Sequence, residues 1–347
     1  MKQGVANVAQ LAEFDEIIDV RSPGEFAEDH VPDAVSCPVL DDEERARVGT
    51  LYKQQSPFAA KKIGAALVAR NISTHLERRF LDRERTWRPL VYCWRGGKRS
   101  GAFAHVLRQI GWDACQLEGG YKAYRRHVVA ELAQLPRRYA WRVVCGATGS
   151  GKSRLLAALA AKGAQVLDLE ALAAHKGSVL GELPQEPQPS QKWFESRLCA
   201  SLERLDPERP VFVEAESRRI GHLQVPDDLL ATMRASPCLR IEASMDARVR
   251  FLLGDYEYFL GDPARLKAKI DCLRGLQSGE TLAHWHALID GGDWPTLVRG
   301  LLDQHYDVLY NRSQGRNYAH YPEAPRYATS DLSPVGLATL AEAILAA

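Results

Sequence analysis

Short apolar runs that end in turn residues recur along the chain, each followed by a stretch with helical spacing. In the first part of the sequence, runs at 17–20, 90–93 and 114–117 predict three buried strands, because each is short and is bounded by turn residues. Between the last two runs, apolar residues recur at helical spacing from about 100 to 110, and Gly111 ends that helix. Strands that alternate with helices indicate a parallel sheet, which binds its ligands at the carboxyl ends of the strands.

The second part of the sequence repeats this alternation. An apolar run at 141–145 predicts a strand and leads through a glycine-rich turn into a helix at about 152–161. Further strands are expected at 165–169, 211–214 and 239–243, and the segment 183–190, rich in Pro and Gln, predicts an exposed loop. Pro136 and a basic cluster interrupt the pattern at 133–142. We therefore expect two α/β domains, 1–135 and 136–347, the second with a helical C-terminal part.

Composition places the chain among ordinary globular proteins. Of its 347 residues, 46% are hydrophobic and 26% are charged, which excludes wholesale disorder and fits two domains. It contains no apolar run long enough to cross a membrane, and its N-terminal segment lacks the features of a secretory signal. The seven cysteines are widely spaced without a C-x-x-C pair. This spacing argues against a metal site or a disulfide scaffold and predicts a reducing compartment, the cytoplasm.

Charge is distributed unevenly, although the net charge is only +1. Residues 13–44 contain twelve acidic residues against Arg21 alone, whereas 76–108 contain nine basic and three acidic residues. Residues 121–145 contain six basic residues and only Glu131. The two basic stretches would attract a polyanion such as a nucleic acid. They are equally typical of solvated helix faces.

One phosphate-binding motif stands out. The segment 146–153 satisfies G-x-x-x-x-G-K-[ST], with an apolar strand before it and a helix after it. Glycines let successive backbone N–H groups converge on one point, where the helix dipole also favours an anion. Lys152 adds a full charge, and Ser153 can bind Mg²⁺. The predicted diphosphate-binding residues are Gly146, Gly149, Gly151, Lys152 and Ser153.

The motif leaves open whether a nucleotide is hydrolysed. Hydrolysis requires an acidic residue at the end of an apolar strand, and Glu214, with Glu216 nearby, is the best candidate. A glutamate in this irregular position supports the hydrolase interpretation only in part. A diphosphate ester other than ATP would fit the same loop, with or without Mg²⁺.

A second chemical motif surrounds one cysteine. Cys93 follows a predicted strand and precedes a loop and a helix N-terminus, so backbone N–H groups and cations surround its thiol. These donors lower a thiol pKa and produce a nucleophile at neutral pH. The same groups would bind a tetrahedral oxyanion. We predict Cys93 as catalytic and assign the oxyanion to Arg95, Gly96, Gly97, Lys98 and Arg99; the other six cysteines are expected to be structural.

The segments 17–34 (IIDVRSPGEFAEDHVPDA), the Cys93 loop and 117–125 (LEGGYKAYR) together resemble a rhodanese domain. The resemblance implies a parallel sheet flanked by helices, with Asp19, Arg21 and His30 as structural residues. The loop departs from the usual sulfurtransferase form, because Cys93 to Arg99 is C-x₅-R, the length used by related cell-cycle phosphatases. Tyr92 stands where a cysteine-dependent phosphatase usually has histidine.

A rhodanese domain followed by a P-loop NTPase-like domain is an unusual combination. Together with the intervening segment 48–72, it makes nearly the whole chain similar to the bacterial tRNA 2-selenouridine synthase family. The resemblance implies conversion of wobble 2-thiouridine in tRNA to 2-selenouridine. It implies two steps, which are S-geranylation from geranyl diphosphate and replacement of the geranylthio group by selenium from selenophosphate.

The resemblance also implies roles for the two motifs. The glycine loop would bind the diphosphate of geranyl diphosphate, and the Cys93 thiolate would take up or direct selenium while its cradle binds selenophosphate. No further cofactor is required for certain, and an enzyme that produces selenophosphate is a candidate partner. Residues expected to contact tRNA are Trp94, Arg125, Arg126, Arg137 and Arg138. Packing of Trp94 within its loop and an ordinary interdomain hinge are the alternatives.

Two other functions remain compatible with the motifs. The first is a C-x₅-R phosphatase, or a rhodanese sulfurtransferase, fused to a P-loop kinase or ATPase. The absence of histidine before Cys93 counts against the phosphatase. The second is a rhodanese module that recruits a partner to an ATPase, and the intact cysteine in its basic loop counts against it.

Overall fold

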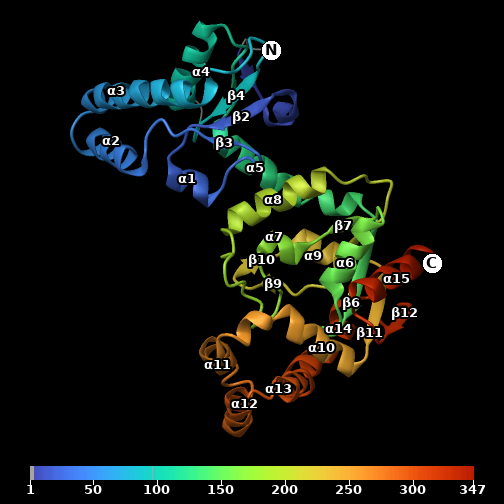
Figure 1. The fold of residues 1–347 in the computed structure, drawn as a ribbon. Coiled ribbons are helices and arrows are strands. Elements are labelled where there is room, and N and C mark those ends of the chain that lie inside the picture. The colour runs from blue at the N-terminus through green and yellow to red at the C-terminus, as the bar shows by residue number, and fades with distance from the viewer. Residues whose placement is uncertain (1–3, 96) are drawn as a thin grey trace. The chain divides into compact units, whose positions relative to one another are not determined.

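The computed structural model describes residues 4–95 and 97–347, without the side chains of 311–314. The chain forms two compact units (Figure 1). Unit 1 comprises residues 1–131 and 195–200, and unit 2 comprises residues 132–194 and 201–347. Leu135 and Pro136, which we expected on either side of the domain boundary, are both buried, and the Trp141 Nε1 group donates to the Pro136 carbonyl at 2.8 Å. The chain therefore enters unit 2 a few residues before the expected boundary.

Unit 1 is built on a parallel five-stranded sheet with the order β1-β5-β4-β2-β3. Its strands are β1 (Val5–Ala6), β2 (Glu16–Asp19), β3 (Val35–Ser36), β4 (Pro89–Tyr92) and β5 (Cys115–Leu117). The three strands predicted from apolar runs are β2, β4 and β5. The edge strands β1 and β3 have two residues each, too few to produce a hydrophobic pattern.

Helices connect these strands, as parallel pairing requires. They are α1 (Pro23–Glu28), α2 (Asp42–Gln54), α3 (Pro57–His75), α4 (Lys98–Ile110) and α5 (Gly120–Leu132). Helices α2 and α3 lie side by side (Figure 1). The core packs β2 and β4 against α4 through Ile18, Val91, Phe103 and Leu107, all completely buried. This packing fixes the loop between β4 and α4, where the predicted nucleophile lies.

Unit 2 contains a second parallel five-stranded sheet, with the order β12-β11-β6-β8-β7. Its strands are β6 (Trp141–Gly146), β7 (Gln165–Leu167), β8 (Val211–Glu214), β11 (Cys238–Ala243) and β12 (Arg326–Thr329). A short antiparallel pair, β9 (Arg219–Ile220) and β10 (Leu223–Gln224), lies outside it. Since both sheets are parallel and joined by helices, the α/β prediction is confirmed.

Helices make up most of the rest of unit 2. Those preceding β11 are α6 (Lys152–Ala161), α7 (Leu169–Ala173), α8 (Gln191–Glu203), of which residues 195–200 belong to unit 1, and α9 (Asp227–Arg234). Those after it are α10 (Met245–Asp255), α11 (Pro263–Asp271), α12 (Gly279–Gly291), α13 (Trp294–Leu301), α14 (Asp307–Asn317) and α15 (Pro334–Leu345). Helices α6 and α15 pack together against the sheet (Figure 1). A separate apolar core joins α11, α12 and α13, with Trp285 fully buried in it.

Within the residues that the structure describes, none of the helices combines the length and the hydrophobicity needed to cross a membrane.

Candidate active site

The predicted nucleophile lies at the carboxyl end of the central strand of unit 1. Cys93 follows β4 directly, and α4 begins five residues later. Its side chain is 4% exposed, and the Ser100 hydroxyl donates to Cys93 Sγ at 3.3 Å. The backbone N–H groups of Gly97 and Ser100 also donate to the sulfur. The loop and the first turn of α4 thus enclose the thiol with hydrogen-bond donors.

These donors outweigh the effect of burial on the thiol. Burial alone would raise the pKa of Cys93, but the hydrogen bonds from Ser100 and Gly97, with the charge of Arg99, bring this pKa below its ordinary value. The opposite holds for Cys37 in the same unit, whose pKa burial raises to about 11. The surroundings of Cys93 therefore favour its thiolate form more than those of an ordinary thiol do.

The cations predicted around Cys93 have different environments. Arg99 forms an ion pair with Glu25 at 2.8 Å, and Arg45 approaches the same carboxylate at 3.0 Å. The side chains of Arg95 and Lys98 are exposed, and Gly96 lies outside the described residues. Because Glu25 neutralises part of the charge of Arg99, the positive charge of the loop comes mainly from Arg95 and Lys98.

The turn at Gly119 and Gly120 holds the Cys93 loop through backbone hydrogen bonds. The Tyr121 N–H donates to the Cys93 carbonyl at 2.8 Å, and the Lys122 N–H donates to the Trp94 carbonyl at 3.1 Å. Gly120 has φ +58°, and a Cβ there would lie 2.3 Å from the Cys93 carbonyl oxygen. Only glycine fits this contact, which explains why the Gly-Gly turn accompanies the cysteine loop. Sequence reasoning noted the turn as part of the rhodanese resemblance but missed its contact with Cys93.

Trp94 is partly exposed at this site. Its ring stacks on Tyr121 with centroids 5.3 Å apart, and 37% of the residue remains accessible to solvent. Tyr121 is held in turn by Arg21, whose guanidinium lies 4.0 Å from the ring centroid. Arg21 is buried and pairs with buried Asp19 at 2.6 Å, which agrees with the structural role expected for both residues. Trp94 thus presents a fixed aromatic surface beside Cys93.

The residue before Cys93 has no contact with solvent. Tyr92 is completely buried, and its hydroxyl accepts a hydrogen bond from the Val31 N–H at 3.1 Å. Burial raises the pKa of Tyr92 well above its ordinary value, so this hydroxyl stays protonated. Tyr92 is therefore a packing residue.

In unit 2, the predicted phosphate loop connects β6 to α6. Gly149 and Gly151 adopt φ of +79° and +75°, the left-handed region that the turn requires. The Lys152 ammonium donates to the Gly146 carbonyl at 3.1 Å, across the loop. All five residues predicted to bind diphosphate, Gly146 to Ser153, thus belong to one turn at the N-terminus of α6.

Three glutamates lie beside this loop. Ser153 Oγ donates to Glu170 at 2.7 Å and to Glu214 at 3.2 Å. Carboxylate oxygens of Glu170, Glu214 and Glu216 lie within 4.8 Å of one another. The sequence pointed to the last two, whereas Glu170 was missed. Its only signal was its position just after strand β7, next to β8 in the sheet.

Burial and mutual repulsion perturb all three carboxyls. Burial and then repulsion from Glu170 raise the pKa of Glu216 to about 8. The pKa of Glu214 is raised well above its ordinary value by burial and then by both neighbours. Among the described residues, Glu214 Oε1 is buried without a hydrogen-bond partner. Clustered carboxylate and hydroxyl oxygens are the donors that Mg²⁺ prefers, so Ser153 and these glutamates fit that ion.

The basic residues predicted to contact tRNA are only partly exposed. Arg126, Arg137 and Arg138 are exposed, and Arg137 pairs with Asp228 at 2.7 Å. Arg125 is half-buried and forms an ion pair with Glu195. Of the exposed arginines, Arg126 belongs to unit 1, and Arg137 and Arg138 belong to unit 2.

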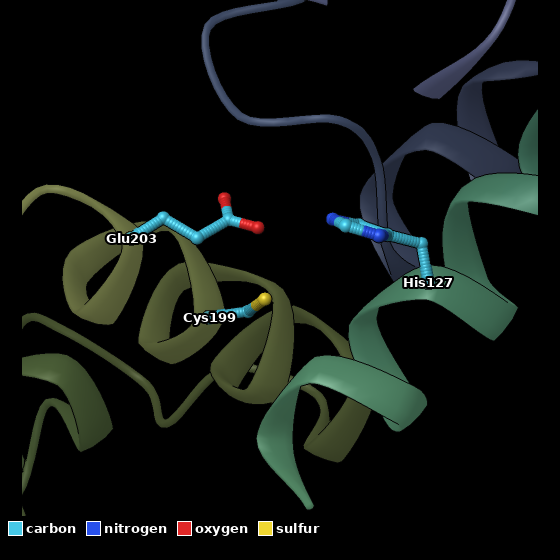
Figure 2. A group of neighbouring side chains, drawn as sticks. All are labelled: His127, Cys199 and Glu203. Carbon is cyan, nitrogen blue, oxygen red and sulfur yellow. The ribbon is translucent and has the colours of Figure 1, made fainter. Parts of the chain in front are cut away.

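Other polar residues occupy helices α5 and α8. Figure 2 shows Cys199 and Glu203 on successive turns of α8 and His127 on α5. Since Cys199 and Glu203 are four residues apart, they project from one face of their helix. Neither helix alone carries the four ligands of a structural metal site.

The fold and these two motifs define a class: a rhodanese domain joined to a P-loop domain. The model of the rhodanese-like domain matches residues 5–127, and that of the tRNA 2-selenouridine synthase AAA domain matches residues 139–278. A tRNA 2-selenouridine synthase from Shewanella denitrificans is 31% identical over 334 residues, covering 85% of this chain and 87% of that protein. The chain belongs to the tRNA 2-selenouridine synthase family.

Other relatives match a shorter part of the chain. A tRNA 2-selenouridine synthase from Nitrosomonas europaea is 39% identical over 244 residues, and one from Nitrosomonas eutropha is 37% identical over 244 residues. Each match covers 69% of this chain, and it spans only 63% and 62% of the respective relative.

Proposed function

We propose that the protein converts wobble 2-thiouridine in tRNA to 2-selenouridine, through S-geranylation and then selenation. Membership of the tRNA 2-selenouridine synthase family supports the overall conversion. The observation that carries the proposal is the environment of Cys93, a thiol whose hydrogen-bond donors favour the thiolate. Seven free cysteines agree with action in the reducing cytoplasm, where tRNA is modified.

In the first step, the sulfur of 2-thiouridine attacks C1 of geranyl diphosphate. A C–S bond forms, the C–O bond breaks, diphosphate leaves, and the uracil loses its N3 proton. The loop from Gly146 to Ser153 stabilises the charge that develops on the diphosphate, since its N–H groups and Lys152 are positioned before the reaction begins. Ser153 and the glutamates would hold Mg²⁺, which would neutralise further charge on the leaving group.

In the second step, selenophosphate binds at the Cys93 loop, with Arg95, Lys98, Arg99 and backbone N–H groups around its phosphate. The Cys93 thiolate attacks phosphorus, so that a P–S bond forms, the P–Se bond breaks and hydrogen selenide anion leaves. Selenide adds to C2 of the S-geranylated base, geranylthiol leaves, and N3 regains its proton. Water then hydrolyses the phosphocysteine to phosphate and the free thiol. Directing selenium in this way requires no oxidant.

The tRNA would be held by the exposed arginines and by the ring of Trp94. Arg126, Arg137 and Arg138 provide sequence-independent phosphate contacts. Trp94 offers a stacking surface for an extruded wobble base. Charge reversal at Arg137 and Arg138 should weaken tRNA binding and flatten its salt dependence. Unchanged binding would place the tRNA elsewhere.

Nucleoside mass spectrometry tests the proposal directly. The protein is incubated with a 2-thiouridine anticodon stem-loop and geranyl diphosphate, with and without selenophosphate. We expect a geranyl adduct that becomes 2-selenouridine once selenophosphate is added. Cys93→Ala should retain the adduct and lose selenation, whereas Cys115→Ala, a matched thiol in the same unit, should retain both. Absence of both products from folded protein would refute the proposal, and loss of both in Cys93→Ala would refute the division of labour.

A second candidate, a C-x₅-R phosphatase joined to a P-loop kinase or ATPase, is favoured by the same thiolate and loop length. It predicts turnover of simple aryl phosphates that depends on Cys93. The buried, protonated Tyr92 before the nucleophile counts against it, because the residue has no path to a substrate. Aryl phosphate and ATP hydrolysis would be measured on the same preparation.

A further inference from the structure

An apolar pocket opens beside the phosphate loop of unit 2. Together with the open solvent at its mouth, it contains about 600 Å³ of empty space. Thirteen of its fifteen lining residues are aliphatic or aromatic, and the other two are Thr148 and Ser178. None of the lining residues is charged. The pocket therefore favours a hydrocarbon ligand over a polar one.

The pocket adjoins the loop that would bind a diphosphate. Thr148 belongs both to the Gly146–Ser153 turn and to the pocket wall. Leu252, another wall residue, lies so close to the turn that a Cβ on Gly149 would be 2.7 Å from its Cδ1. Arg248 fixes this junction, since its Nε donates to the Thr148 carbonyl at 2.8 Å and its guanidinium pairs with Asp307.

The glutamate cluster adjoins the same pocket from another side. A Cβ on Gly177 would lie 2.6 Å from Glu170 Oε1 and 3.3 Å from Glu216 Oε1. The next residues along the chain, Ser178 and Leu180, line the pocket. One short segment thus connects the candidate Mg²⁺ ligands with the apolar wall. A single ligand with an anionic part and a hydrocarbon part would place the first near the glutamates and the second in the pocket.

The wall offers little to a purine base. Its polar groups are few, and the Ser178 hydroxyl lies 3.5 Å from that of Tyr256. Tyr256 stacks on Phe259 with an interplanar angle of 6°, and α13 contributes Leu297 and Leu301. A nucleotide base would bury several donors and acceptors here against a wall that is mostly apolar, at a cost in affinity. A hydrocarbon chain has no such groups to satisfy.

We propose that this pocket receives the hydrocarbon chain of a prenyl diphosphate whose diphosphate lies on the Gly146–Ser153 turn. The proposal rests on the proposed function and deepens it, because it assigns the residues that recognise the alkyl group. Burial of each methylene strengthens binding about fourfold. Burial of about four such groups would make geranyl diphosphate at least about a hundredfold tighter a ligand than inorganic pyrophosphate.

Calorimetric titration of the full chain tests this with inorganic pyrophosphate, dimethylallyl, geranyl and farnesyl diphosphate, and ATP. We expect affinity to rise from pyrophosphate through dimethylallyl to geranyl diphosphate, with ATP weaker than geranyl diphosphate. Val298→Phe places a ring in the pocket from the half-buried Val298 on α13. It should reduce geranyl diphosphate binding at least about tenfold, since more than one methylene contact is lost, and leave pyrophosphate binding unchanged.

Two further variants keep the test decisive. Leu260→Ala removes a wall residue that is 38% exposed, so the fold tolerates the change, and it should weaken geranyl diphosphate several-fold. Leu276→Ala, 66% exposed and outside the pocket, should bind every ligand as the wild type does. The proposal is wrong if chain length does not affect wild-type affinity, or if Val298→Phe weakens pyrophosphate and geranyl diphosphate equally.

These outcomes separate the pocket from the overall reaction. If geranyl diphosphate binds with the expected chain-length preference but no tRNA adduct forms, the pocket assignment is supported and the proposed function is refuted. If the adduct forms while Val298→Phe and Leu260→Ala leave the chain-length preference unchanged, the function stands and the pocket assignment is wrong.

Discussion

The glutamate cluster beside the phosphate loop should make the free protein less stable as the pH rises. Burial and repulsion from Glu170 raise the pKa of the Glu216 carboxyl from its ordinary value near 4.5 to about 8. Between these values the folded state keeps a proton that the unfolded state has released. Stability therefore falls by about 1.4 kcal/mol for each pH unit across this window.

Glu216→Gln removes this titration. From about pH 5.5 to about pH 7.5, the wild type should lose about 3 kcal/mol through Glu216 that the variant does not lose. Lys152, whose charge lowers the pKa of Glu216, is present in both proteins and does not cancel the difference. The stability of the variant relative to the wild type should thus rise by about 3 kcal/mol across this range.

Hydrogen exchange of the β8 amides in a chelating buffer measures this local stability, after correction for the intrinsic pH dependence of exchange. Glu208→Gln, at an exposed position before the amino end of β8, serves as the matched control and should follow the wild type. Parallel pH profiles for the wild type and Glu216→Gln would refute the reasoning. Added Mg²⁺ should reverse the wild-type trend, because a bound cation favours the ionised carboxyls.

Three further substitutions test unit 1. Ser100→Ala removes the hydroxyl that donates to Cys93 Sγ at 3.3 Å and should raise the pKa of the Cys93 thiol. The ultraviolet absorbance of the thiolate should therefore appear at higher pH than in the wild type. An unchanged titration would contradict this hydrogen bond. Gly120→Ala places a Cβ 2.3 Å from the Cys93 carbonyl oxygen, which should displace the Cys93 loop. Selenation should then fall at least about tenfold while pyrophosphate binding persists. Full selenation would show that the backbone accommodates the added Cβ without displacing Cys93. Asp19→Ala leaves the Arg21 guanidinium buried and should cost about 3 kcal/mol in urea unfolding, whereas a loss below about 1 kcal/mol would mean that water reaches the pair.

Local sequence patterns predicted the elements that hold the two motifs. The apolar runs became β4 and β6, and the helix expected at 152–161 is α6 with the same bounds. These elements are set by nearest-neighbour burial and by glycines with obligatory positive φ, properties that a short window of sequence contains. The positions of Cys93 and of the phosphate loop followed from the same windows.

Contacts between distant segments could not be predicted in this way. The pairing of Arg99 with Glu25, the approach of Gly120 to the Cys93 carbonyl, and the place of Glu170 beside Ser153 all join residues far apart in the chain. Each depends on which strands become neighbours and on how the connecting loops close, and the sequence pattern of a single strand carries neither.

The sequence by itself determined the two α/β frameworks, the position of Cys93 after a strand and the glycine turn before a helix, because backbone sterics and the alternation of apolar runs act over short distances. Only the tertiary structure decided how the thiol is stabilised, which carboxyls share the phosphate loop, and that an apolar pocket opens beside it. Those properties arise from burial and from charges brought within a few ångströms of one another, and only the folded chain creates either.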